Sequence, residues 1–205
     1  MSLFPLFVKL DGRPCLVVGA GPVGEAKITS LLRAGANVRV VAPRASRTVR
    51  AWARAGRISW EARGFDPADL DGAFLVVAAT SSADLHKRVF REAKRRGVLC
   101  NVVDDPERCD FYYPAVVRRC HLQIAISTGG QSPALAQRLR RELELQFGLE
   151  YELWLEQLGQ ARQKLLARRI HPERRRRLFH RLASRQALAG FVRRMAAANR
   201  RKNRP

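Results

Sequence analysis

Hydrophobic and polar residues alternate in blocks through the first 113 residues, and these blocks predict strands and helices in turn. The clearest block is the unbroken apolar run at 74–79, which is typical of a strand buried on both faces of a parallel sheet. The expected strands are 14–18, 37–42, 58–61, 74–79 and 98–103, and the expected helices are 25–34, 49–55 and 84–96. Strands that alternate with helices predict right-handed crossovers. The predicted fold class is therefore α/β, with a Rossmann-type parallel-sheet domain over residues 1–113.

The pattern changes after residue 113. Ser132 suits a helix N-cap and Pro133 suits the first position of the helix that follows. The elements expected here are an antiparallel pair of strands at 115–117 and 122–127, a helix at 133–147, and helical segments from 149 onward with breaks near 171–172 and at Gly190. We therefore expect a small α+β region over 114–148 and a helical C-terminal region with a basic tail over 149–205.

Three glycines stand between the first expected strand and the first expected helix, at the end of the run Val-Val-Gly-Ala-Gly-Pro-Val-Gly. In a dinucleotide-binding turn, Gly19 would permit the turn and Gly21 would let the backbone approach a pyrophosphate. Gly24 would let the helix pack closely on the strand. The N–H groups and positive dipole end of the helix would face the anion. A dinucleotide is therefore the first candidate ligand.

The second expected strand lacks the acidic residue that binds the adenosine ribose in ordinary NAD sites. Its end has the sequence Ala42-Pro43-Arg44. Arg44 could bind a 2′-phosphate and so favour NADP, or backbone groups around Pro43 and Arg44 could hold the ribose. The residues by themselves leave both alternatives open.

Two loops carry the remaining candidate chemistry. Asp104 follows the strand expected at 98–103 and is a candidate general base, with a turn or cap role as the alternative. Asp105 has the weaker claim, because it directly precedes Pro106 and could serve only the turn. The loop at 127–133 opens a helix with two glycines. It could bind a carboxylate or phosphate through backbone N–H groups, or simply connect a strand to a helix.

The net charge of +21 is concentrated near the C-terminus. Residues 161–205 contain 16 lysines and arginines but one acid, Glu173. A polyanionic small molecule or a nucleic acid would suit such a surface, although no nucleic-acid reading motif accompanies it. The segment 199–205 could also be a solvated tail.

The four cysteines and four histidines match no metal-ligand spacing, so we expect free thiols and no metal site. The sequence contains no run of about 18 apolar residues, which a membrane span would need. The N-terminus does not resemble a secretory signal. We therefore expect a cytoplasmic protein that binds no membrane.

Seven short motifs then occur in a recognisable order. They are Phe-Pro-Leu-Phe at 4–7, the glycine run at 17–24, Val-Ala-Pro at 41–43, Ala-Ala-Thr at 78–80, Cys-Asn-Val-Val-Asp at 100–104, Phe-Tyr-Tyr-Pro-Ala at 111–115 and Ile-Ser-Thr-Gly-Gly-Gln-Ser-Pro at 126–133. Together they resemble the precorrin-2 dehydrogenase/sirohydrochlorin ferrochelatase family, in the stand-alone form of the N-terminal half of siroheme synthase, roughly over residues 3–195.

The resemblance implies oxidation of the tetrapyrrole precorrin-2 to sirohydrochlorin with NAD, and in many members insertion of Fe²⁺ to give siroheme. It also implies an intertwined homodimer, with 114–148 as the central dimerisation region. The alternatives are a non-catalytic nucleotide-sensing Rossmann module and a basic nucleic-acid-binding protein. The former usually keeps an acid after the second strand, and the latter lacks a reading motif here, so we expect no nucleic-acid partner.

Site residues follow from the resemblance and the motifs together. The family's essential aspartate maps onto Asp104. Its NAD contacts map onto Pro22 and Val23 and onto Pro43 and Arg44, so the resemblance implies NAD even though the second strand lacks the usual acid. The full cofactor set is Gly19, Gly21, Pro22, Val23, Gly24, Pro43, Arg44 and Thr80. The candidates for binding substrate carboxylates are Arg118, Arg119, Ser127, Thr128, Gly129 and Gly130. Thr128 stands where some members carry a regulatory serine.

Overall fold

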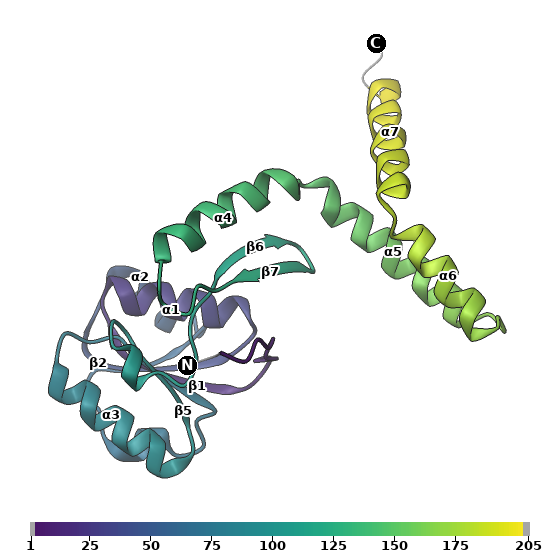
Figure 1. The fold of residues 1–205 in the computed structure, drawn as a ribbon. Helices are drawn as coiled ribbons and strands as arrows, with labels where there is room; N and C mark the ends of the chain where they lie inside the picture. The colour runs from purple at the N-terminus through teal and green to yellow at the C-terminus, as the bar shows by residue number, and fades with distance from the viewer. Residues whose placement is uncertain (1–2, 203–205) are drawn as a thin grey trace. The chain divides into compact units, whose positions relative to one another are not determined.

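The computed structural model describes residues 3–202, with side chains described as far as residue 198 (Figure 1). The chain forms two compact units, with the boundary between Tyr113 and Pro114. The first unit is a five-stranded sheet in the order β3-β2-β1-β4-β5, and every neighbouring pair is parallel. Its strands are β1 (Pro14–Ala20), β2 (Asn37–Ala45), β3 (Ser59–Glu61), β4 (Leu75–Ala78) and β5 (Leu99–Val102). Its helices are α1 (Pro22–Arg33), α2 (Arg47–Arg54) and α3 (Ala83–Arg96), with short 3₁₀ turns η1 (Pro67–Leu70) and η2 (Pro106–Arg108). The predicted α/β class is confirmed.

Both faces of this sheet are buried, as the continuous apolar strands require. Alternate residues of β1 face opposite sides, so Val17 packs in the cluster with Ile28 of α1, while Leu16 packs in the cluster with Val89 of α3. Figure 1 shows α1 and α3 on opposite sides of the strands. The sheet register shifts between Val18 and Ala20, where the chain leaves β1 for the glycine turn.

The segment after β5 returns along the edge of the sheet. The Asp110 N–H donates to the Cys100 carbonyl at 2.7 Å, and the Cys100 N–H donates to a carboxylate oxygen of Asp110 at 3.0 Å. Buried Asn101 donates from Nδ2 to the Phe111 carbonyl at 2.8 Å. These bonds cover the open edge of β5 and hold the turn that contains Asp104.

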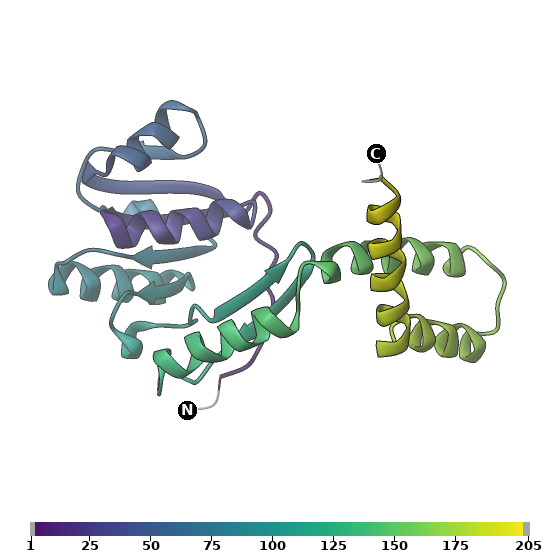
Figure 2. The same cartoon turned by 90° about the horizontal axis from the view of Figure 1, so that it is seen from above.

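The second unit contains an antiparallel hairpin and four helices. They are β6 (Ala115–Arg119), β7 (Leu122–Ile126), α4 (Pro133–Gln146), α5 (Glu150–Leu166), α6 (Pro172–Leu182) and α7 (Arg185–Lys202). Helix α4 packs on the hairpin, and α5 contacts α6 and α7 (Figure 2). The expected hairpin and the expected helix after Ser132 are confirmed, and Ser132 accepts the Leu135 N–H at 3.2 Å.

The expected helix break at Gly190 is wrong. Helix α7 continues through Gly190, since one glycine costs a helix only about 1 kcal/mol. The helices part instead at 183–184, where Ser184 accepts the Ala187 N–H at 3.2 Å as an N-cap would. A further division of the second unit at residue 148 stays a prediction. The expected basic tail at 199–205 carries no described side chains, and 203–205 lie outside the described residues.

Candidate dinucleotide and catalytic site

The three glycines of the turn after β1 have three different reasons to be glycine. Gly19 has φ +105°, and a Cβ there would lie 2.2 Å from the Ala79 carbonyl oxygen. A Cβ on Gly24 would lie 2.3 Å from the Gly19 carbonyl oxygen, so helix and strand touch at this point. A Cβ on Gly21 would meet nothing within 4 Å. Position 19 therefore needs glycine for its positive φ, and position 24 needs glycine for the close contact of helix and strand. The space beside Gly21 is unoccupied by protein atoms.

The open space lies at the N-terminus of α1. Gly21 is the N-cap and provides no side-chain cap, and Pro22 has no N–H. The first helical bond runs from the Glu25 N–H to the Gly21 carbonyl at 2.9 Å. The N–H groups of Val23 and Gly24 precede that bond and have no intrahelical acceptor. Space beside Gly21 together with two free donors fits the pyrophosphate of a dinucleotide.

The end of β2 lies against this turn. Strand β2 runs three residues further than expected, because Ala45 pairs with Ala20 beyond the register shift. Pro43 and Arg44 are exposed there. The Ser46 N–H donates to the Ala20 carbonyl at 3.0 Å, which fastens the loop after β2 to the glycine turn. Two of the expected cofactor residues thus stand beside the glycines.

An acidic residue reaches this place from α1, which sequence reasoning missed. The Ser46 hydroxyl donates to Oε2 of Glu25 at 2.6 Å. Glu25 directly follows the third glycine, and an acid in the first turn of a helix is usually explained by the helix dipole. The sequence contained a signal for this role: an acid directly follows the third glycine, and the second strand lacks the acid that ordinary NAD sites have.

Thr80 completes the expected cofactor set at the end of β4. Its Oγ1 accepts the Ser82 N–H at 3.2 Å, and its methyl group lies 3.2 Å from the place of a Cβ on Gly19. The structure therefore brings Thr80 to the glycine turn. Because β1 and β4 are parallel neighbours, both loops leave the carboxyl edge of the sheet, where ligands bind in open α/β folds.

Asp104 stands at the same edge, in the turn after β5. Its φ is +61°, a left-handed conformation that costs a non-glycine residue about 1–2 kcal/mol. The turn is closed by the Asp105 N–H donating to the Val102 carbonyl at 3.2 Å, and the Val103 N–H donates to the Ala78 carbonyl at 3.0 Å. The Asp104 side chain is exposed, whereas the Asp105 carboxylate is paired with Arg108. The fold thus leaves Asp104, not Asp105, available for chemistry.

Two groups near Asp104 were not predicted. The Lys27 ammonium of α1 lies 3.7 Å from the centroid of the Tyr113 ring, a cation–π contact. Burial lowers the pKa of Lys27, although the charges of Asp104 and Cys109 act in the opposite direction. The Cys109 Sγ donates to the carbonyls of Val102 and Asp105, both at 3.2 Å, and burial raises the pKa of this thiol. Cys109 therefore helps to fix the turn rather than serving as a nucleophile.

The other candidate residues lie in the second unit. The Ser127 hydroxyl accepts the Gly129 N–H at 3.1 Å, and the Thr128 hydroxyl accepts the Ser132 N–H at 3.2 Å. Gly129 and Gly130 have φ +61° and +85°, so the loop needs glycine there. Arg119 donates to the carbonyls of Glu144 and Arg118, both at 2.8 Å, and so serves the packing of α4 on the hairpin. Arg118 is exposed.

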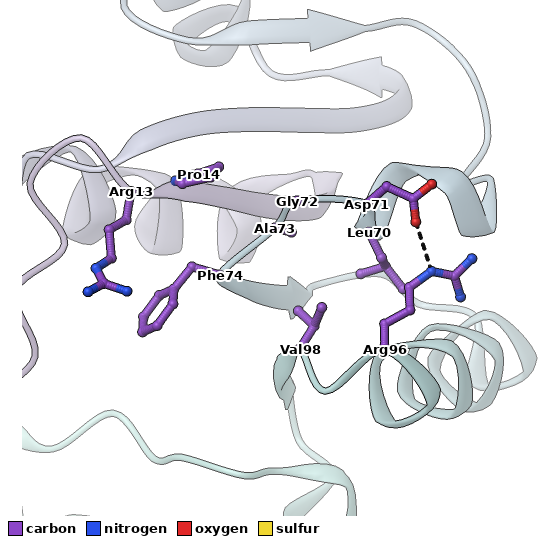
Figure 3. Close-up of a pocket in the computed structure, with 9 residues that line it drawn as sticks. All are labelled: Arg13, Pro14, Leu70, Asp71, Gly72, Ala73, Phe74, Arg96 and Val98. Carbon is purple, nitrogen blue, oxygen red and sulfur yellow. Dashed lines mark hydrogen bonds and ion pairs between the residues drawn. The ribbon is translucent and has the colours of Figure 1, made fainter.

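A surface hollow lies at the opposite edge of the first unit, around the starts of β1, β4 and β5 (Figure 3). The Arg13 guanidinium lies 4.4 Å from the centroid of the Phe74 ring. The Arg96 Nε donates to Asp71 at 3.0 Å, the bond drawn in Figure 3. The two arginines of this hollow thus already have partners. The hollow lies at the amino ends of the strands, away from the glycine turn and Asp104.

The described residues contain neither a cluster of metal ligands nor a membrane-spanning helix. Between residues 3 and 202, no three His, Cys, Asp or Glu side chains are grouped as a metal site would need. Over the same range, no helix combines the length and the apolar character of a membrane span.

Comparisons with known proteins match both units. Residues 6–115 match the family described as putative NAD(P)-binding, and residues 119–146 match the family described as sirohaem biosynthesis protein central. Siroheme synthase 1 of Pectobacterium atrosepticum is 42% identical over 182 residues, which are 89% of this chain and 38% of that protein. Siroheme synthase 1 of Cronobacter sakazakii is 49% identical over 144 residues, which are 70% of this chain and 31% of that protein. The chain thus spans less than two fifths of these relatives.

A solved structure has a similar fold over nearly the whole chain. It is SirC, a precorrin-2 dehydrogenase, with a TM-score of 0.78 and 25% identity, covering 95% of this chain and all of that one. The resemblance expected from the sequence motifs is therefore confirmed. The match to the family described as putative NAD(P)-binding extends over residues 6–115, which are more than half of the chain. The chain therefore belongs to that family.

Proposed function

We propose that this protein oxidises precorrin-2 to sirohydrochlorin with NAD. The observation that carries the proposal is the exposed carboxylate of Asp104, held at positive φ on the sheet edge that bears the glycine turn. A residue kept in an unfavourable conformation next to a cofactor-binding turn suggests a functional role. Similarity to siroheme synthases and to the precorrin-2 dehydrogenase SirC gives the substrate class, a polycarboxylate tetrapyrrole.

The residues of the first unit divide the work. When bound, NAD supplies the hydride acceptor. The N–H groups of Val23 and Gly24 would hold its pyrophosphate, and Thr80 lies beside the same turn. As a C–H bond of the macrocycle loses its hydride, an oxygen of Asp104 accepts the proton that the substrate also releases. Two electrons and one proton leave together as the hydride, and the second proton passes through Asp104 to water.

Cations bind the carboxylates of the substrate. Lys27 stands near Asp104, where its ammonium would hold a carboxylate of the macrocycle and orient the ring toward the base. Of the two arginines of the second unit that are predicted to bind carboxylates, Arg118 is the stronger candidate, because its side chain is exposed. Arg119 is the weaker candidate, because its guanidinium already binds two carbonyls.

We propose Fe²⁺ insertion as a second activity of the same site. The iron is a substrate here, and the macrocycle supplies its nitrogen ligands. Asp104 would accept the pyrrole N–H protons that Fe²⁺ displaces. We also propose that the protein works as a homodimer through the second unit, where Leu145 and Leu149 have 88% and 74% of their surface exposed. Light scattering would give twice the chain mass.

Anaerobic incubation with precorrin-2 tests both activities at once. With NAD⁺ we expect the absorbance of sirohydrochlorin to appear, and with added Fe²⁺ the absorbance of siroheme. Asp104→Ala serves as the matched control. If no sirohydrochlorin forms with NAD⁺ and none forms with NADP⁺, the proposed dehydrogenase activity is refuted. Sirohydrochlorin that persists after Fe²⁺ is added would refute only the ferrochelatase.

A further inference from the structure

We propose that Glu25 makes the cofactor site select NAD over NADP. The proposal rests on the dinucleotide-binding half of the proposed function and on no property of the tetrapyrrole. It answers the question that the end of β2 leaves open, since Pro43 and Arg44 occupy the place where an NAD site usually has an acid.

The position of Glu25 is fixed by bonds on both sides of the turn. Its N–H donates to the Gly21 carbonyl at 2.9 Å, so the residue belongs to the first turn of α1. Its Oε2 accepts the Ser46 hydroxyl at 2.6 Å, and the Ser46 N–H donates to the Ala20 carbonyl at 3.0 Å. The carboxylate therefore bridges the glycine turn and the loop after β2. In a Rossmann fold the adenosine ribose binds between these two segments.

The direction of the Ser46 hydrogen bond leaves Glu25 free to accept another. Ser46 Oγ accepts the Val49 N–H at 3.2 Å as the N-cap of α2, so its single hydrogen points to Glu25. A carboxylate has about four acceptor positions on two oxygens, and Ser46 uses one of them. The remaining positions suit the 2′- and 3′-hydroxyl donors of NAD. A 2′-phosphate offers no such donor and brings a second negative charge to the same place.

The cations nearby act against this selection. Arg44, near the end of β2, and Arg47, at the start of α2, are exposed and would attract a 2′-phosphate. Their charges stand in solvent, where ions screen them within about 8–10 Å. Glu25 is half-buried and held in place, so its repulsion of a phosphate is less screened. We therefore expect the fixed carboxylate to outweigh the solvent-exposed guanidinium groups.

The test measures binding without tetrapyrrole, by fluorescence titration of NADH and of NADPH. The wild-type protein should bind NADH more tightly. Glu25→Gln keeps a side-chain oxygen that can accept from Ser46 but removes the charge. It should reduce the preference for NADH at least about tenfold, because facing like charges are strongly unfavourable. Glu25→Ser should change the preference in the same direction. Thermal melts verify that both variants fold.

Arg47→Ala, which removes a nearby cation outside the predicted cofactor set, is the matched control and should preserve or increase the preference for NADH. Two outcomes overturn the proposal: wild-type protein that favours NADPH, or an unchanged preference in both Glu25 variants. In the second case normal NADH binding leaves the proposed dehydrogenase standing. Wild-type protein that binds neither nucleotide would refute the cofactor half of the proposed function as well.

Discussion

The two units of the chain bury their apolar residues to very different extents. The first packs both faces of a parallel sheet, with Val17, Val38, Val40, Val76 and Val77 fully enclosed. Among the described residues of the second unit, the buried apolar side chains are Ala115, Val117, Ala136 and Phe191. The first unit thus has a core of its own, which suits a rigid frame for catalytic groups. The second presents leucines that a partner surface would cover.

The largest expected effect of any substitution is a loss of activity at Asp104, the catalytic carboxylate that we propose in the first unit. Asp104→Asn keeps a residue that tolerates positive φ but cannot accept the proton. Sirohydrochlorin formation should fall by about 10²–10⁴-fold, the usual range for a lost general base, while NADH binding and the melting temperature stay near wild type. Asp105→Asn is the control and should retain most activity. A variant at Asp104 that turns over normally would contradict its assignment.

Two glycines of the same turn should separate packing from binding. Gly24→Ala places a Cβ 2.3 Å from a backbone oxygen, so unfolding in urea should show a loss of about 3 kcal/mol. Gly21→Ala meets no atom within 4 Å and, as a change at the N-cap of α1, should cost about 1 kcal/mol or less. Its methyl group would nevertheless fill the pyrophosphate space and weaken NADH binding. Equal stability losses in the two variants would mean that the turn packs differently.

These glycines show how far sequence reasoning reaches. The roles of Gly19, Gly21 and Gly24 follow from their spacing between a strand and a helix, because backbone geometry alone dictates them. The contacts of Glu25 with Ser46 and of Lys27 with Tyr113 join residues that are distant in the sequence. They depend on how the loops fold back on the sheet, which no local pattern contains.

The boundaries show the same limit. Strand β2 extends to Ala45 only because Ala20 pairs with it beyond the register shift. Helix α7 continues through Gly190 because one glycine costs a helix little, and it begins at the local N-cap Ser184. The order and type of elements were therefore predictable from hydrophobic spacing, whereas the end of β2 depended on a tertiary partner and the start of α7 on a cap.

A smaller effect is expected at Asp69 of the turn η1, which binds Arg39 of β2 and Arg63 of the segment after β3. Its side chain is 3% exposed and accepts from Arg39 at 3.1 Å and from the Asp66 N–H at 2.8 Å. Burial acts to raise the pKa of Asp69, but hydrogen bonds from Arg63 and from Asp66 outweigh it and hold the pKa below its usual value. Asp69→Asn should cost about 2 kcal/mol of unfolding free energy at neutral pH.

The pH dependence of that cost has a definite sign. Because the pKa of the folded state is lowered, the contribution is complete above the usual aspartate range and is lost as pH falls toward the folded-state pKa. Urea unfolding of wild type and Asp69→Asn should therefore converge in acid. In the second unit, Glu142→Gln breaks the exposed pair with Arg138 and should cost about 0.5 kcal/mol or less. If the difference in unfolding free energy between wild type and Asp69→Asn stays constant down to acid pH, the ion pairs of Asp69 do not explain it.

The smallest effect on unfolding should come from Leu145→Gln combined with Leu149→Gln. Both side chains are already exposed, so the stability of the single chain should change by less than about 0.5 kcal/mol. If a second copy covers these residues, the same change exposes polar amides to an apolar interface and should shift the protein from dimer to monomer in light scattering. Leu99→Gln in the first unit is the control, since that side chain is 38% exposed and belongs to β5. A dimer that survives the double change and is lost in the control would place the interface on the first unit, and the exposed leucines at the end of α4 and at the N-cap of α5 would then need another partner.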